Sequence, residues 1–259
     1  MTAGWDAKAY HQVSEPQFAW GKKVLERLSL RGDETVVDAG CGTGRLTALL
    51  LERLPRGRVI AVDRDAGMIA EARLHLAPFG DRVDCRVHDL LELPAFGADA
   101  IFSTATFHWI TDHDTLFRRL FAALKPGGVL VAQCGGGRNL SRVLSRLAPI
   151  LAEPELAPFF AGAPTPWRYA GPDDTRARLT AAGFVDVEAW LTSAPTPFPD
   201  RDSFRRFVDR VILGQRLAPL AGPTRERVVD RIVELSAQDD PPFVLDYVRL
   251  DLGGRRPNA

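Results

Sequence analysis

The sequence predicts an α/β protein with a mostly parallel β-sheet and helices on both faces of that sheet. Short segments rich in β-branched residues alternate along the chain with amphipathic segments of helical period. Strands that alternate with helices pair in parallel through right-handed crossovers. The length of 259 residues suits one such domain with insertions, and we expect a single domain over residues 1–259.

The first elements surround a glycine-rich turn. After an N-terminal arm, residues 1–16, a helix over residues 17–29 is predicted by apolar residues on one face, Trp20, Val24, Leu25 and Leu28. Residues 36–44, Val-Val-Asp-Ala-Gly-Cys-Gly-Thr-Gly, then predict a buried strand, a tight turn and the start of a helix. Glycine allows the backbone to approach a ligand closely, and such a turn presents free amides to it.

The spacing of the glycines distinguishes this turn from a dinucleotide-binding one. Dinucleotide folds use G-x-G-x-x-G to seat a pyrophosphate on a helix N-terminus. Here Gly40, Gly42 and Gly44 follow the pattern G-x-G-x-G, and Asp38 stands just before them. A carboxylate there repels a pyrophosphate and attracts an ammonium group, so the turn indicates a nucleotide-like cofactor without phosphate.

Acidic residues follow the next two predicted strands. The strand over residues 58–62 ends at Asp63, placed to accept hydrogen bonds from two ribose hydroxyls. A helix comes next, with Met68, Ile69, Ala72 and Leu76 on one face. The following strand, residues 83–87, leads to His88, Asp89 and Leu90.

The fourth and fifth strands flank the clearest helix. Residues 99–104 and 129–134 predict the strands, and the turn Lys-Pro-Gly-Gly at 125–128 precedes the fifth. The helix between them has one apolar stripe, Leu116, Phe117, Leu120, Phe121 and Leu124. We interpret Asp112-His113-Asp114 as the cap of this helix and predict no metal site.

The rest of the chain has a different pattern. Helices are predicted over residues 139–151, from Pro172 to Gly183, and over about 201–218 and 224–237, with a proline-rich stretch at 154–166. Strands are predicted over residues 184–191 and 243–252.

Composition excludes several classes of partner. Lys plus Arg and Asp plus Glu number 33 each, so no overall charge attracts nucleic acid or an anionic membrane. Cys41, Cys85 and Cys134 are odd in number and lack metal-ligand spacing, which indicates reduced, buried thiols. With no long apolar run and no signal-peptide pattern, we expect a cytoplasmic protein. The oligomeric state is left open.

The order of these elements resembles that of the class I S-adenosylmethionine-dependent methyltransferases. Five features match in the family's order over residues 30–135: the glycine-rich turn, Asp63, Asp89, the fourth strand and the Lys-Pro-Gly-Gly turn. Three further segments resemble the trans-aconitate and malonyl-carrier-protein carboxyl methyltransferases: Trp5, Tyr10 and Gln17; Phe-His-Trp at 107–109; and Asp-Tyr-Val-Arg-Leu at 246–250. His11 stands where those families usually have an acid.

This resemblance implies a Rossmann-like, seven-stranded sheet with the last strand antiparallel beside the fifth. Residues 30–135 would form the cofactor-binding core. Residues 138–170 and 198–240 would be insertions that form a helical lid over the substrate pocket, because they leave from the ligand-binding edge of the sheet.

The resemblance also implies the cofactor, S-adenosylmethionine, which becomes S-adenosylhomocysteine. Asp38 would face the methionine ammonium group, Asp63 would bind the ribose, and Asp89 with the backbone of Leu90 would read the adenine. Further cofactor-binding residues are expected in the glycine turn and at strand ends: Gly40, Cys41, Gly42, Gly44, Arg64 and Thr104.

The acceptor would be a small molecule, methylated on a carboxylate or hydroxyl oxygen. Methyl transfer is an in-line displacement at an already activated carbon, so the protein mainly aligns the reactants. His108 is either a general base or a residue that bonds the backbone and shapes the pocket, since an ionised carboxylate needs no base. Tyr10 and Trp109 would shape the methyl-transfer pocket.

The resemblance nominates Gln17 and Trp109 for binding a substrate carboxylate. Arg138, directly after the fifth strand, is a further candidate for an anionic substrate. The alternative is that Arg138, Arg142 and Arg146 form a solvated helix face. Trp167, Arg168 and Tyr169 either close the lid or pack in the core.

Two other functions compete with methyl transfer. An NAD(P)-dependent oxidoreductase would also use Asp63. Three features count against it: residue 45 is Arg where the dinucleotide pattern G-x-G-x-x-G has its third glycine, and the acids Asp38 and Asp89 are present. A protein that binds S-adenosylmethionine without catalysis would be expected to have lost pocket residues, and none is missing here. A nucleic-acid methyltransferase lacks support from charge and from any Asn-Pro-Pro-Tyr-like sequence after the fourth strand.

Overall fold

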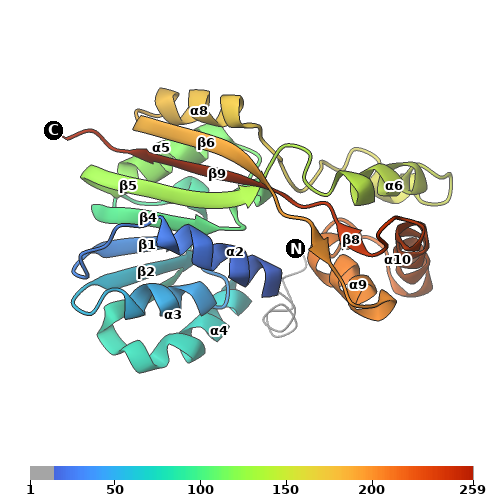
Figure 1. The fold of residues 1–259 in the computed structure, drawn as a ribbon, viewed down its shortest axis with the longest axis horizontal. Helices are drawn as coiled ribbons and strands as arrows, with labels where there is room; N and C mark the ends of the chain where they lie inside the picture. Colours follow the sequence, from blue (N-terminus) through green and yellow to red (C-terminus); the bar gives the residue numbers. More distant parts are fainter. Residues whose placement is uncertain (1–14, 259) are drawn as a thin grey trace.

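The computed structural model describes residues 15–258 and shows a central sheet with a helical lobe at one end (Figure 1). The predicted N-terminal arm, with Tyr10 and His11, lies almost wholly outside the described residues. The elements up to residue 135 are α2 Glu15–Glu26, β1 Thr35–Ala39, α3 Arg45–Glu52, β2 Arg58–Asp63, α4 Ala66–Leu76, η1 Ala77–Arg82, β3 Val83–Val87, η2 Leu90–Glu92, β4 Ala98–Thr104, η3 Phe107–Trp109, α5 His113–Ala123 and β5 Leu124–Gly135.

The second half of the chain adds four strands and most of the lobe. Its elements are α6 Ser141–Leu151, α7 Ala157–Phe160, α8 Pro172–Ala181, β6 Val185–Ser193, β7 Thr196–Pro197, α9 Arg201–Phe207, η4 Val208–Ile212, α10 Gly222–Ala237, β8 Val244–Leu245 and β9 Val248–Arg255.

The main sheet has seven strands in the order β3-β2-β1-β4-β5-β9-β6. All neighbours up to β5 pair in parallel, whereas β9 pairs antiparallel with both β5 and β6. The predicted Rossmann-like α/β fold is therefore confirmed, including the antiparallel strand beside the fifth.

Alternate residues of the strands build two separate cores on the two faces of the sheet. On β1, Val36 packs with α2, α3 and α4, while Val37 belongs to the cluster that includes α5 and α8. This alternation is the period of two expected for a strand buried on both sides.

The helical lobe, residues 140–160 and 198–247, has a third hydrophobic core of its own. Side chains from α6, α9, η4 and α10 contribute to it, and β7 and β8 form a small two-stranded sheet at its base. The two segments predicted as insertions thus pack on each other and not separately.

Several boundaries differ from the sequence-based expectation. The predicted helix over 201–218 ends early, because α9 continues into a π-helical turn, η4, closed by a hydrogen bond from the Leu213 amide to the Val208 carbonyl at 2.8 Å. The predicted strand over 243–252 is divided into β8 and β9, and Phe243 before them has a left-handed φ of 55°.

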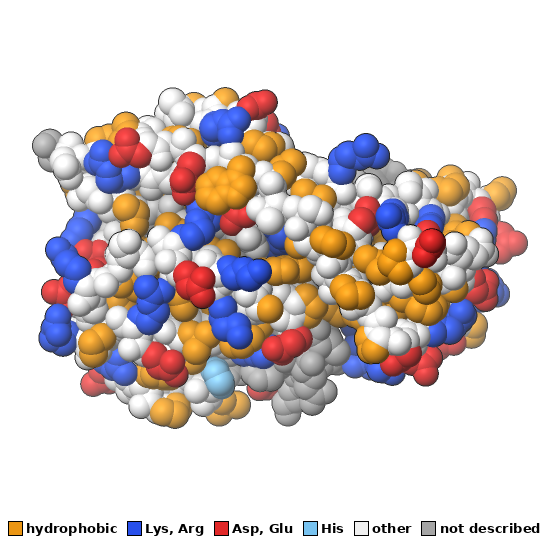
Figure 2. Space-filling view, viewed as in Figure 1, with side chains coloured by type: hydrophobic (Ala, Val, Ile, Leu, Met, Phe, Trp, Pro, Cys, Tyr) orange, Lys and Arg blue, Asp and Glu red, His pale blue; other side chains and the backbone are white. Residues whose placement is uncertain are grey.

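The surface carries mixed charge. On the face in Figure 2, acidic and basic side chains are interspersed over both the sheet region and the lobe, with no field of one sign. Within residues 15–258, no helix is long and apolar enough to cross a membrane.

The third core allows a direct test of the lobe. We expect Ile232→Ala, at a fully buried position of α10, to lower the free energy of unfolding by about 2–5 kcal/mol, because it leaves a cavity. Leu235→Ala on the same helix is the control, since Leu235 is 37% exposed and should cost less than about 1 kcal/mol. Urea unfolding measures both, and equal effects would mean that the lobe is not a packed core.

Candidate cofactor and acceptor site

The carboxyl ends of the parallel strands meet at one edge of the sheet, and a pocket opens there. Most of the residues nominated for the cofactor line it: Gly40, Gly42, Asp63, Arg64, Asp89, Leu90 and Thr104. Met68, Ala105, Thr106, Trp109 and Ile110 complete the lining. An adjoining pocket is lined by Asp38, Cys41 and Thr43, together with Gln17 and Arg45. The nominated cofactor residues are thus brought together, with the exception of Gly44.

The glycine turn needs its glycines for two different reasons. Gly40 has a φ of 84°, and a Cβ there would lie 2.1 Å from the Thr106 hydroxyl oxygen, so the turn and the loop after β4 can touch only at a glycine. Gly44 has a φ of 80° and precedes α3, and a Cβ there would lie 2.9 Å from Leu76 of α4. Gly44 therefore allows α3 and α4 to pack and does not line the pocket.

Asp63 is held at the end of β2 by backbone amides. Its two carboxylate oxygens accept hydrogen bonds from the Gly42 N–H at 3.0 Å and the Asp65 N–H at 2.9 Å. Burial raises the pKa of Asp63 in spite of these two bonds. The carboxylate has further lone pairs for hydroxyl donors, which suits a ribose.

Asp38 is a buried carboxyl group on β1 beside the glycine turn. It is 2% exposed and accepts a hydrogen bond of 2.6 Å from the Thr47 hydroxyl of α3. Burial raises its pKa to about 7, and the nearby Asp63 adds to the increase. A cation placed next to Asp38 would reverse this increase, because an opposite charge favours the ionised form.

Asp89 lies at the start of η2, where one carboxylate oxygen accepts the Leu91 N–H at 2.9 Å. This bond fixes the carboxylate, which lines the pocket together with the buried Leu90. An exocyclic amino group of a base can donate to the remaining oxygen.

A third pocket lies on the side of the helical lobe. It is lined by Gln17, Ala105, His108, Trp109, Asn139, Leu140, Tyr169, Val211, Ile212, Tyr247 and Arg249. Gln17, Ala105 and Trp109 also line one or both cofactor pockets, so the compartments meet at the loop after β4. Ala105 in this loop has a left-handed φ of 54°, the kind of strained backbone that concentrates at functional sites. Because this third pocket is a candidate site for the methyl acceptor, we call it the acceptor pocket.

His108 is buried at the back of the acceptor pocket. Its Nδ1 accepts the Gly135 backbone N–H at 3.3 Å, so the ring proton lies on Nε2. Burial lowers the pKa of His108 well below its usual value, and Arg249 and His113 lower it further. His108 is therefore neutral at ordinary pH, with an N–H donor and no remaining acceptor, which speaks against the general-base alternative.

Arg249 of β9 is a buried cation in the same pocket. It is 3% exposed, and its guanidinium carbon lies 4.6 Å from the centre of the Trp20 ring. Its Nε lies 3.5 Å from the amide oxygen of Gln133 on β5. A guanidinium group offers several donors in one plane, which matches a carboxylate.

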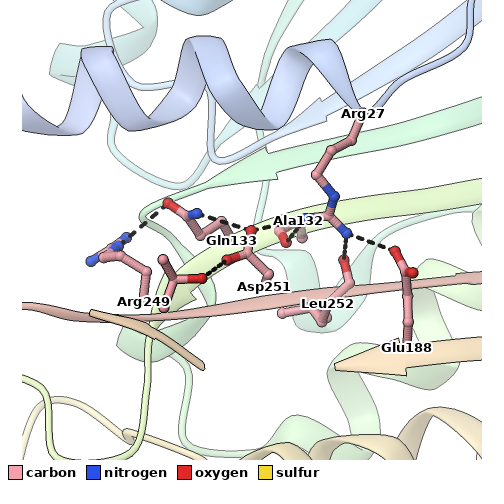
Figure 3. A network of polar contacts seen from close by, with 8 residues as sticks. Arg27, Ala132, Gln133, Glu188, Arg249, Asp251 and Leu252 are labelled. Atoms are coloured by element: carbon pink, nitrogen blue, oxygen red, sulfur yellow. Dashed lines mark hydrogen bonds and ion pairs between the residues drawn. The ribbon is translucent and has the colours of Figure 1, made fainter. Parts of the chain in front are cut away.

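Figure 3 shows the polar contacts behind Arg249. Gln133 donates to Asp251 at 2.9 Å, and Asp251 also accepts from Arg27 of α2 at 3.0 Å. Arg27 in turn pairs with Glu188 of β6 at 2.9 Å. The bond to Asp251 orients the Gln133 amide so that its oxygen faces Arg249, and the network ties β5, β9, β6 and α2 together behind the pocket.

The cation that lines the pocket is Arg249, which was not predicted from the sequence, and not the predicted Arg138. Arg138 is exposed and is absent from the linings of the described pockets. A signal for Arg249 was present: Arg249 and Asp251 stand two residues apart in an apolar strand, so both point to the same face. Charged residues paired in that way inside a buried strand indicate a polar site. Arg146, in contrast to the solvated-face alternative, pairs with Asp239 and Ser236 of the lobe.

The aromatic residues after α7 reach the acceptor pocket. Tyr169 lines it, and the Tyr169 ring lies 5.8 Å from His108, while Trp167 packs against Trp109 at 6.1 Å. Burial raises the pKa of Tyr169 to about 12, so its phenol remains a hydrogen-bond donor. Asp112 caps α5 as predicted, and residues 15–258 contain no cluster of potential metal ligands.

The residues at the site fit S-adenosylmethionine. Asp38 is a buried carboxylate suited to an ammonium group, and the amide oxygen of Gln17, where the pockets meet, is buried without a hydrogen-bond partner among the described residues. Asp63 and Asp89 are fixed by backbone amides with acceptor capacity left over. Together with the sheet order, these features define a class I methyltransferase.

Comparison with known sequences places the chain within that class. A family described as "Methyltransferase domain" matches residues 36–128. The trans-aconitate 2-methyltransferase of Methylobacterium nodulans is 31% identical over 262 residues, which cover 98% of this chain and 99% of that protein. That of Deinococcus radiodurans is 30% identical over 87% of each chain. The chain belongs to the class I S-adenosylmethionine-dependent methyltransferases, resembles their trans-aconitate group, and uses S-adenosylmethionine as its cofactor.

Solved structures agree on the fold. Phosphoethanolamine N-methyltransferase 2 of Haemonchus contortus superposes with a TM-score of 0.65 at 19% identity, covering 97% of this chain and 57% of that one. The YcgJ protein of Bacillus subtilis gives a TM-score of 0.62 at 14% identity, covering 95% of this chain and all of that one.

The raised pKa of Asp38 predicts a pH dependence of cofactor binding. Above about pH 7 the carboxyl group is ionised and attracts the ammonium group, and below it protonation removes this attraction. We expect the affinity for S-adenosylmethionine to fall about tenfold or more between pH 7.5 and pH 5.5. Calorimetric titration measures it. Asp38→Asn should bind weakly with a flatter profile, and an equally flat profile of the natural protein would contradict the assignment.

Asp63 is expected to bind the ribose. Asp63→Asn should weaken S-adenosylmethionine binding at least about tenfold, because it removes charge-assisted hydrogen bonds. Asp202→Asn, at an exposed position of α9, makes the same chemical change far from the pocket and should leave the affinity unaltered. If both variants bound alike by calorimetry, the ribose site would have to be elsewhere.

Proposed function

We propose that this enzyme methylates a carboxylate oxygen of a small-molecule acid. The observation that carries the proposal is the acceptor pocket, where Arg249 and His108, whose Nε2 carries the ring proton, line a space that joins the cofactor pockets at Ala105. Two donors of this kind suit a carboxylate. The relatives named trans-aconitate 2-methyltransferase act, by that name, on a carboxylic acid, which supports the same chemistry here.

When bound, S-adenosylmethionine supplies a sulfonium methyl group, so that an O–C bond forms as the C–S bond breaks, the electron pair stays on sulfur, and a carboxylate loses no proton. The residues of the chain orient the acceptor and exclude water. Arg249 and His108 hold the carboxylate, and Trp109 forms the wall between acceptor and cofactor. Gln17 can form a hydrogen bond with either ligand, because rotation of its side-chain amide presents the acceptor oxygen or the donor NH2 group.

A hydroxyl acceptor is the second candidate from the sequence. It would need a base to remove its proton, and His108 has no acceptor atom left once Nδ1 bonds the Gly135 amide. A carboxylate acceptor needs no base. The proposal therefore keeps His108 as a positioning donor and favours carboxylate over hydroxyl. Tyr10, outside the described residues, stays a proposed neighbour of the methyl-transfer pocket.

The helical lobe is proposed to act as the lid of a single domain. Leu140, Val211 and Ile212 of the lobe line the acceptor pocket, whereas residues 30–135 supply nearly all of the cofactor site. A lid that excludes water strengthens the electrostatic contacts to a bound carboxylate.

Arg249→Gln tests the proposal. With labelled S-adenosylmethionine and a panel of small carboxylic acids, we expect KM for the acid to rise at least about tenfold, since a charge-assisted pair is lost. Arg249→Lys keeps the charge but not the planar donors, so its KM for the acid should lie between that of the natural enzyme and that of Arg249→Gln.

Arg142→Gln, an exposed arginine on α6, provides the matched control and should leave KM unchanged. Calorimetric binding of S-adenosylmethionine by each variant shows that its cofactor site is intact. A rise in KM with Arg138→Gln and not with Arg249→Gln would return the role to the cation nominated from the sequence.

A further inference from the structure

The acceptor pocket is lined by two chemically different sets of side chains. One set is polar and includes Arg249, His108 and Tyr169 of the sheet region and Tyr247 of the lobe. Leu140, Val211 and Ile212 of the helical lobe, all less than 8% exposed, contribute apolar side chains to the other. We call these three residues the apolar wall.

A π-helical turn presents most of the apolar wall. Val211 and Ile212 are the last residues of η4. Its characteristic hydrogen bond joins residues five apart, from the Leu213 amide to the Val208 carbonyl. Val211 and Ile212, adjacent in sequence at the end of this turn, both line the pocket. π-helical turns are rare in proteins, and those that occur are often found at functional sites. This geometry therefore points to a role in ligand binding in addition to packing.

Charge in the pocket is limited. Among the pocket-lining residues of the described chain, Arg249 is the only charged side chain, because His108 is neutral and Tyr169 stays protonated. One guanidinium group matches one carboxylate. A second carboxylate placed against Val211 or Ile212 would lose its hydration without gaining a charged partner among residues 15–258, which costs several kcal/mol.

From these observations we infer that the acceptor is a carboxylic acid with one buried carboxylate and an apolar substituent, and that Val211 and Ile212 determine this specificity. The inference rests on the proposed carboxylate methylation and narrows it. The inferred acceptor differs from trans-aconitate, the substrate for which the relatives are named, because trans-aconitate is a tricarboxylate with no apolar substituent.

Three acids separate these possibilities in a methyl-transfer assay: trans-aconitate, 2-hexenoate with an apolar tail, and crotonate with only a methyl group in its place. We expect kcat/KM of the natural enzyme for 2-hexenoate to exceed that for trans-aconitate at least about tenfold. Each methylene in an apolar pocket is worth about tenfold or more in kcat/KM.

Variants of the apolar wall test whether Val211 and Ile212 cause the preference for 2-hexenoate. Val211→Ala and Ile212→Ala should lower kcat/KM for 2-hexenoate at least about fivefold and change that for crotonate less than about twofold. Ile212→Val is a milder second variant in case the larger truncation disturbs folding. Val208→Ala, in the same turn but buried in the lobe and not in the pocket, should affect both acids equally.

Each other result overturns the inference in a recognisable way. Preference for trans-aconitate, or equal losses for 2-hexenoate and crotonate in the Val211 and Ile212 variants, would refute the apolar wall while leaving carboxylate methylation intact. Failure to methylate any of a broad panel of acids, with S-adenosylmethionine bound normally, would refute the proposed function and this inference together.

Discussion

The parallel pairing of β1 with β2 and β4 is the constraint on which the site depends. It brings the ends of these strands to one edge, so that Asp38, Asp63 and Thr104, far apart in sequence, line two adjoining pockets. The glycine turn can close against the loop after β4 only because Gly40 has no side chain. Strand register and one glycine together position the cofactor site.

Charge is divided between the two halves of the site. Carboxylates of Asp38, Asp63 and Asp89 line the cofactor side, and the Arg249 guanidinium lies on the acceptor side. A cofactor with an ammonium group and an acceptor with a carboxylate are complementary to this division. Arg64 and Arg45 also line the cofactor pockets, whereas Arg249 is the one charged side chain that lines the acceptor pocket among the described residues.

The residues predicted to bind the cofactor could be placed together from the sequence because they follow strands in a recognisable local order, and their binding roles stay predictions. Asp63 and Asp89 each come directly after an apolar run, and their position at the edge follows from parallel pairing alone. The acceptor side depends on contacts between distant segments. Arg249 enters through an antiparallel strand, the role of His108 depends on the Gly135 amide, and Ile212 depends on a π-helical turn that periodicity cannot distinguish from an ordinary helix.

The antiparallel direction of β9 has a consequence for the order in which the protein is made. Because β9 runs against its neighbours, its first residues, including Arg249, lie at the edge where the parallel strands end. During synthesis, the residues that surround the cofactor leave the ribosome well before residue 249, and the guanidinium group can join the pocket only when β9 inserts between β5 and β6. A nascent chain can therefore hold the pockets lined by Asp38 and Asp63 in nearly complete form while the pocket lined by Arg249 is still unfinished.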